Sequence, residues 1–121
     1  MAAGDEGAPL AHLSMPPPER PERPGSAVVL LHGTGDDEFG LLPIGAALQA
    51  ALKGSLVLSC RAPLAFPGGG GYRHFEGYSF DPAPAALEHQ VAEAADSALE
   101  MCAWARRRHG VDKVGECALH S

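Results

Sequence analysis

The residues best suited to chemistry lie in a glycine turn that follows a short apolar run. Residues 27–31 are all apolar and lead directly into His32, Gly33, Thr34 and Gly35. A short apolar run that ends in a glycine turn is typical of a strand buried on both faces of a parallel sheet. Gly33 and Gly35 can adopt backbone angles that other residues avoid, so the chain can turn sharply and expose its amides. Exposed amides can bind a negatively charged oxygen, either of a phosphate group or of a reacting ester.

The pattern argues against nucleotide and metal sites. The turn lacks the third glycine of a dinucleotide-binding motif and the lysine of a phosphate loop, and the four glycines at 68–71 lack that lysine too. The histidines have none of the spacings that metal sites use, and we interpret them as surface or turn residues: His12, His32, His74, His89, His109 and His120. We therefore expect no metal and no cofactor, and acyl transfer is the chemistry that remains.

A helix and a second strand should follow the turn. Apolar residues at spacings of three and four predict a helix over about 41–53 whose buried face carries Leu41, Ile44, Leu48 and Leu52. The acids at 36–38 precede this helix, on the side that its dipole favours, and Lys53 with Gly54 should end it. Residues 55–60 form the next apolar run, so the two strands should be parallel with a right-handed crossover.

The second half of the chain repeats this alternation. Residues 64–83 are irregular, and both a flap over a pocket and a solvated excursion remain open alternatives. A longer apolar stripe predicts a helix over 84–109, whose basic end at 106–109 complements the helix dipole before Gly110. A third strand is expected over 113–119. The sequence thus predicts an α/β fold with three parallel strands and helices packed on the sheet.

Composition limits the partners and the location. Six prolines and interleaved charges predict that residues 1–26 form a disordered tail, which leaves residues 27–121 as one domain. The net charge of −6 argues against nucleic acid and anionic membrane surfaces. No segment approaches the length of about 18 apolar residues that spans a bilayer, and the acidic N-terminus does not fit a signal or transit peptide. Cys60, Cys102 and Cys117 are interpreted as buried reduced thiols of a cytoplasmic protein.

The turn and the end of the second strand together resemble a known enzyme family. Residues 30–37, Leu-Leu-His-Gly-Thr-Gly-Asp-Asp, and residues 61–63, Arg-Ala-Pro, are similar to motifs of the phospholipase, carboxylesterase and acyl-protein thioesterase group of α/β-hydrolases. The resemblance extends from residue 27 to about 115 and implies that the strand at 27–31 lies between the other two. It also implies a serine esterase or thioesterase that acts on small acyl esters. The backbone N–H of Thr34 would then stabilise the oxyanion, with His32 and Gly33 shaping the turn.

The C-terminal residues depart from this family. In that family, the strand that corresponds to residues 113–119 ends in a Gly-x-Ser-x-Gly elbow. Here Leu119 stands where glycine is needed, and Ser121 is a weak candidate for the nucleophile. The Asp and His of the triad should follow the serine and are absent. We therefore expect an inactive partial α/β-hydrolase, such as a truncated product. The alternative is a non-catalytic product that binds a partner through its open sheet edges or its proline-rich tail. The two exposed sheet edges would also favour self-association.

Overall fold

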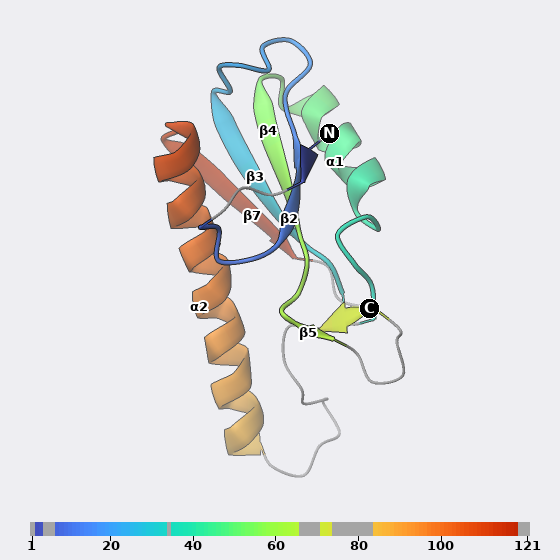
Figure 1. Ribbon diagram of the computed structural model, residues 1–121, viewed down its shortest axis with the longest axis vertical. Coiled ribbons are helices and arrows are strands. Elements are labelled where there is room, and N and C mark those ends of the chain that lie inside the picture. The colour runs from blue at the N-terminus through green and yellow to red at the C-terminus, as the bar shows by residue number, and fades with distance from the viewer. Residues whose placement is uncertain (1, 4–6, 34, 66–70, 74–83, 119–121) are drawn as a thin grey trace.

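The computed structural model describes residues 2–3, 7–33, 35–65, 71–73 and 84–118. In these residues a five-stranded sheet has the order β1-β2-β4-β3-β7, and a separate two-stranded hairpin pairs β5 with β6 (Figure 1). The elements are β1 Ala2–Ala3, β2 His12–Met15, β3 Ser26–Leu31, α1 Leu42–Ala51, β4 Ser55–Cys60, β5 Leu64–Ala65, β6 Tyr72–Arg73, α2 Pro84–His109 and β7 Lys113–Ala118.

Strand β3 occupies the centre of the parallel part of the sheet. It pairs in parallel with β4 on one side, with Leu31 opposite Cys60, and with β7 on the other, with Leu31 opposite Ala118. The predicted positions of all three strands and their order are confirmed. Because the three strands run in the same direction, their last residues, Leu31, Cys60 and Ala118, all lie at one end of the sheet.

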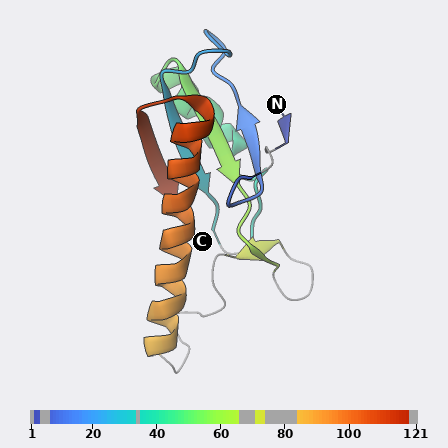
Figure 2. The same ribbon diagram turned by 60° about the vertical axis from the view of Figure 1, so that its left-hand side comes forward.

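The two helices cover opposite faces of the sheet (Figure 2). On one face, Val29 and its neighbours in β3 and β4 pack against α2 in the larger core, which includes Met101 and Trp104. On the other face, Val28, Leu30 and Val57 pack under the start of α1 in a smaller core. The apolar runs at 27–31 in β3 and 56–58 in β4 are therefore explained by burial on both faces.

The first residues of the chain overturn one prediction. The expectation of a disordered tail over 1–26 is wrong for β2, which pairs antiparallel with β4, with His12 opposite Cys60. The buried side-chain amide of Gln49 anchors the end of this strand, because its Nε2 lies 2.7 Å from the carbonyl oxygen of Met15 and 3.1 Å from that of Ser55. Pairing partners distant in sequence thus order a segment whose own composition favours disorder.

The same strand corrects the prediction of two exposed sheet edges. The outer side of β4 is not exposed, because β2 covers it. Among the described residues, β7 pairs only with β3, so its outer side is the longer open edge of the sheet. Strand β4 therefore has no free edge for pairing with another chain. Of the two edges that were predicted to be exposed, only that of β7 is unpaired among the described residues.

Helix α1 has the predicted position and part of the predicted buried face. Leu41 is buried and Leu48 packs against the smaller core, whereas Ile44 and Leu52 are 38% and 51% exposed. Within the helix, the buried residues are Gly45 and Gln49. A Cβ atom at Gly45 would lie 3.0 Å from the Sδ of Met15 and 3.1 Å from a methyl group of Val57. The absence of a side chain at this position therefore lets the helix approach the sheet, and this contact sets its rotation.

Helix α2 ends as the sequence predicts. Arg106, Arg107, Arg108 and His109 form its last turn, and the backbone N–H of Gly110 donates to the carbonyl of Arg106 at 3.0 Å. The basic run is therefore accounted for by the helix terminus. In the part of the chain that the structure describes, neither helix is both long and apolar enough to cross a bilayer.

Candidate functional site

The candidate site lies at the carboxyl ends of the parallel strands β3, β4 and β7. The loop after β3 and the loop after β4 meet there, and the β5–β6 hairpin lies beside them (Figure 1). In open α/β sheets, ligands bind outside the carboxyl ends of the strands. The glycine turn singled out by the sequence is part of this edge.

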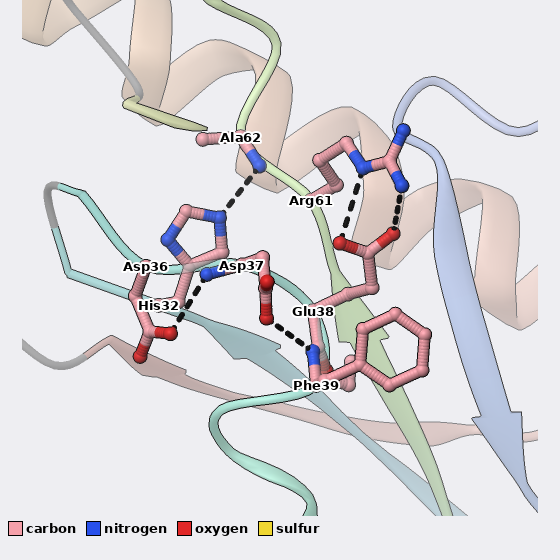
Figure 3. Close-up of polar contacts among 8 residues, drawn as sticks. His32, Asp36, Asp37, Glu38, Phe39, Arg61 and Ala62 are labelled. Atoms are coloured by element: carbon pink, nitrogen blue, oxygen red, sulfur yellow. Dashed lines mark hydrogen bonds and ion pairs between the residues drawn. The ribbon is translucent and has the colours of Figure 1, made fainter. Parts of the chain in front are cut away.

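His32 fastens these two loops together. Its side chain is 1% exposed, and its Nε2 accepts a hydrogen bond of 3.0 Å from the backbone N–H of Ala62 (Figure 3). The ring proton must then reside on Nδ1, which donates to the carbonyl of Gly33 at 2.7 Å. The predicted role of His32 in shaping the turn is consistent with these contacts. The general interpretation of the histidines as surface or turn residues holds for His32, although its ring is buried, but is wrong for His12, which lies in β2 and is 3% exposed.

A short network of backbone hydrogen bonds sets the shape of the turn. The N–H of Asp36 donates to the carbonyl of Gly33 at 3.1 Å, and the N–H of Gly35 donates to the carbonyl of Tyr72 at 2.9 Å. The N–H of Tyr72 returns a bond of 2.9 Å to the carbonyl of Asp36. Gly35 has a φ of 87°, which requires glycine, whereas Gly33 does not enter that region. Of the two glycines, only Gly35 is needed for its backbone conformation.

Two of the predicted site residues cannot be placed. Thr34 and Ser121 lie outside the described residues, so the proposed oxyanion donor and the candidate nucleophile stay predictions. The register nevertheless fixes where their segments begin. Leu31 and Ala118 are opposite each other in adjacent parallel strands, which lie about 4.8 Å apart in a sheet. Strands β3 and β7 therefore end side by side at Leu31 and Ala118.

The acids at 36–38 precede α1, as predicted, and two of them also accept hydrogen bonds within the loop. Helix α1 has no acidic residue in its first turn. The Oδ1 of Asp36 accepts from the N–H of Asp37 at 2.8 Å, and the Oδ1 of Asp37 accepts from the N–H of Phe39 at 2.9 Å. Both carboxylates thus stabilise tight turns within the loop. Their effect is to give the glycine turn a fixed continuation rather than to start the helix.

The sequence analysis missed the ion pair between Glu38 and Arg61. The Nε of Arg61 lies 3.1 Å from one carboxylate oxygen of Glu38, and its Nη2 lies 2.6 Å from the other (Figure 3). The Glu38 side chain is 6% exposed and that of Arg61 39%. The hydrogen bond to Glu38 raises the pKa of Arg61, against the opposing effect of its partial burial. In the sequence, Glu38 lies in the loop after β3 and Arg61 directly follows β4, and these two positions were the signal that could have indicated the pair.

The hydroxyl of Ser59 and the ring of Tyr72 complete this cluster. Ser59 Oγ donates to the carbonyl of Glu38 at 2.6 Å, and the Arg61 guanidinium carbon lies 4.6 Å from the centre of the Tyr72 ring. No group of three or more His, Cys, Asp or Glu side chains that could hold a metal is found among the described residues. Among the described residues, the site thus consists of hydrogen-bonded backbone amides, the imidazole of His32 and the ion pair between Glu38 and Arg61.

Comparison with known proteins places this arrangement in a recognisable fold. No protein-family model matches the sequence, and no curated protein does. Among solved structures, the chain is similar to the esterase PE8, with a TM-score of 0.74 and 20% identity over 92% of this chain and 51% of that one. It is also similar to a carboxylesterase from Mesorhizobium loti, with a TM-score of 0.62 and 21% identity over 98% of this chain and 53% of that one.

These similarities establish the fold. The chain has a partial α/β-hydrolase fold, as predicted, and it spans about half the length of each of the two esterase structures.

Proposed function

We propose that this chain supplies the oxyanion-binding turn of a serine hydrolase that acts on acyl esters or thioesters. The carrying observation is the position of the turn. It lies at the end of the central strand β3, beside the end of β7, and the buried ring of His32 holds it in place. The esterase structures with the same fold support the same assignment. Lysophospholipids and thioesters are narrower candidates within this substrate class.

The proposed chemistry uses the turn for charge stabilisation. Attack of a serine hydroxyl on an ester carbonyl moves an electron pair onto the carbonyl oxygen, and the N–H of Thr34 would donate to that oxyanion. His32 is not suited to be the general base, because Nδ1 and Nε2 both engage backbone groups. A serine hydroxyl without a base is a poor nucleophile. We therefore propose that the 121 residues alone do not turn over esters, and that an Asp and a His must complete the site.

Hydrolysis of p-nitrophenyl esters of increasing acyl length tests this proposal. The purified chain is compared with its Ser121→Ala variant and with a longer product of the same gene, if its reading frame encodes a Gly-x-Ser-x-Gly elbow. We expect the 121-residue chain to match the buffer blank and the longer product to hydrolyse the short esters. Hydrolysis by the chain that Ser121→Ala abolishes would show that Ser121 is an active nucleophile. Failure of the longer product on every ester would contradict the esterase assignment.

A second candidate function is binding through the open side of β7. A Cβ atom added at Gly115 would have no atom within 4 Å, and a hollow of about 520 Å³ lies beside it, lined in part by Leu52 and Val114. Unpaired strand edges favour pairing with another strand. We propose a second copy of this chain as the partner of this module.

The two candidate functions separate in sedimentation velocity experiments over a range of concentrations. Gly115→Glu adds a charge where space is open, and Leu99→Glu adds the same charge on α2, at a position that is 62% exposed. For the binding module, we expect a concentration-dependent dimer that Gly115→Glu weakens and Leu99→Glu does not. A monomer at every concentration would contradict it.

We also propose a cytoplasmic location. In the described part of the chain, Cys60 and Cys102 are buried thiols that form no disulfide, which fits a reducing compartment.

A further inference from the structure

Arg61 connects three segments that meet at the candidate site. Its guanidinium binds the carboxylate of Glu38 with two nitrogen atoms and lies over the ring of Tyr72. Its backbone N–H donates to the carbonyl of Ala11 at 2.7 Å, just before β2. This one residue after β4 therefore contacts the loop after β3, the β5–β6 hairpin and the N-terminal segment.

These contacts close a circuit around the glycine turn. The ring of Tyr72 lies under the guanidinium, and its backbone carbonyl accepts from the N–H of Gly35. The backbone N–H of Tyr72 donates to the carbonyl of Asp36. Glu38, on the other side of the guanidinium, is two residues further along the same loop. Tyr72 thus contacts the turn from the side of the β5–β6 hairpin, and Glu38 lies on the side of α1. Arg61 contacts both residues.

The hairpin can approach the turn only because residue 71 is glycine. Gly71 has a φ of 83°, and a Cβ atom there would collide with the carbonyl oxygen of Gly35. This close contact places Tyr72 under Arg61. The geometry therefore couples the position of the turn to the position of the arginine.

An arginine is required by the shape of this cluster. Two parallel N–H bonds to a buried carboxylate together with stacking on an aromatic ring need a planar guanidinium, which lysine cannot replace. Loss of the guanidinium would also leave the carboxylate of Glu38 without its counter-ion at a site that is only 5% exposed.

We propose that Arg61 is a positioning residue for the oxyanion turn. It holds Gly35, the residue that follows Thr34 in the sequence, in place through its contacts with Tyr72 and Glu38. As a role in the reaction this rests on the proposed function, but the clamp itself can be measured on the chain without any activity.

Amide hydrogen exchange of Arg61→Lys, followed by NMR, tests the clamp. Lysine keeps the charge but loses the paired bonds and the ring stacking. We expect the amide of Gly35 to exchange about tenfold faster or more, with a shifted proton resonance, while the amide of Val29 in β3 is unchanged. Arg107→Lys, the same substitution at an exposed arginine of α2, should leave both amides unchanged.

Further variants keep the inference open to refutation. Glu38→Gln keeps the shape of the side chain and removes its charge, and Tyr72→Leu removes the ring. Each should accelerate exchange at Gly35 as Arg61→Lys does, and one of them remains usable if another fails to fold. Unchanged exchange and resonance at Gly35 in the folded variants would overturn the clamp. Equal acceleration at Gly35 and Val29 would also overturn it, because that result indicates a general loss of stability.

A catalytic measurement separates the clamp from the esterase assignment. In a longer product that hydrolyses esters, Arg61→Lys should lower kcat by about tenfold or more with little change in KM, because oxyanion donors act in the transition state. A rise in KM by about tenfold with kcat unchanged would overturn the positioning role and leave the esterase assignment intact. If no product hydrolyses esters, the exchange data still decide whether the clamp exists, and only the proposed function fails.

Discussion

The Nε2 atom of His32 accepts a hydrogen bond from the backbone N–H of Ala62, across 30 residues of sequence and from the end of one parallel strand to the end of the next. This contact uses the ring as a fixed connector. The ring's other nitrogen donates to the carbonyl of Gly33, so a single neutral imidazole satisfies one buried amide and one turn carbonyl. The histidine of the glycine turn is therefore a structural member of the site.

Replacement of His32 should destabilise the fold through unsatisfied backbone groups. In His32→Ala the buried N–H of Ala62 loses its acceptor, and we expect the free energy of unfolding to fall by about 2–3 kcal/mol. His32→Gln keeps an oxygen that can accept from Ala62, so its loss should be about 1 kcal/mol. Urea unfolding measures both values, and an unchanged slope shows that only stability has changed. Equal losses for the two variants would contradict the connector role.

Gln49 should control the docking of β2 more than the stability of the sheet centre. Gln49→Leu removes the donor to the carbonyls of Met15, Pro16 and Ser55, and we expect a loss of about 1–3 kcal/mol. Hydrogen exchange measured by mass spectrometry should show faster exchange in β2 than in β3. Gln49→Glu, which presents a charged acceptor to three carbonyls, should have a larger effect. Equal exchange in both strands would contradict this local role.

Gly71 and Gly110 form a matched pair for the effect of a close backbone contact. Both have positive φ, but a Cβ atom at Gly71 would collide with Gly35, whereas at Gly110 it would meet nothing within 4 Å. Gly110→Ala should therefore lower stability by about 1 kcal/mol from backbone strain alone. Gly71→Ala should lower it by at least about 1 kcal/mol more. Thermal unfolding compares them, and equal losses would show that the hairpin can move away from the turn.

Alkaline pH should destabilise the protein through Cys60. Burial, assisted by Cys102, raises the pKa of the Cys60 thiol from 9.0 to about 12. Above pH 9 the unfolded chain ionises this thiol while the folded chain keeps it protonated, so stability falls as the pH rises towards 12. The decrease should approach about 1.4 kcal/mol per pH unit in this window.

Cys60→Ala provides the control for this pH dependence. Other groups also titrate above pH 9, and their contribution remains in the variant. The difference between the two unfolding curves at pH 8 and pH 10 therefore isolates the thiol. Parallel losses in the two proteins would contradict the raised pKa. Alkylation of the folded protein at pH 8 should likewise spare Cys60 until the chain unfolds.

The elements that the sequence predicted are those with local signals. Strands β3 and β4 contain the apolar runs at 27–31 and 56–58, and α2 has a long apolar stripe with a basic end, followed by a glycine. Their order in the sheet followed from the family resemblance, which the two esterase structures support as a fold. The buried face of α1 was predicted correctly for Leu41 and Leu48 but not for Ile44 and Leu52. The close approach of Gly45 to Met15 and Val57 contributes to the rotation of the helix, and periodicity within the helix does not contain this contact.

The features that the sequence did not predict depend on distant pairs. Strand β2 has four residues and is held by β4 and by Gln49, so its proline-rich surroundings gave the opposite prediction. Glu38 and Arg61 are 23 residues apart, and neither residue alone indicates an ion pair. For the candidate site, the role of His32 in shaping the turn agrees with its contacts. Thr34 and Ser121 stay predictions, because they lie outside the described residues.

The unequal sides of the sheet also limit how far an assembly could grow. Two copies joined at β7 would be related by a twofold axis, and each would complete the other's ladder. A filament would need a second matching side on every copy. Among the described residues that opposite side ends in β1, which has only two residues and offers too short a ladder. Such a protein would form dimers and no longer assemblies. Strands β1 and β2, which precede β3 in the chain, would protect it from fibre formation.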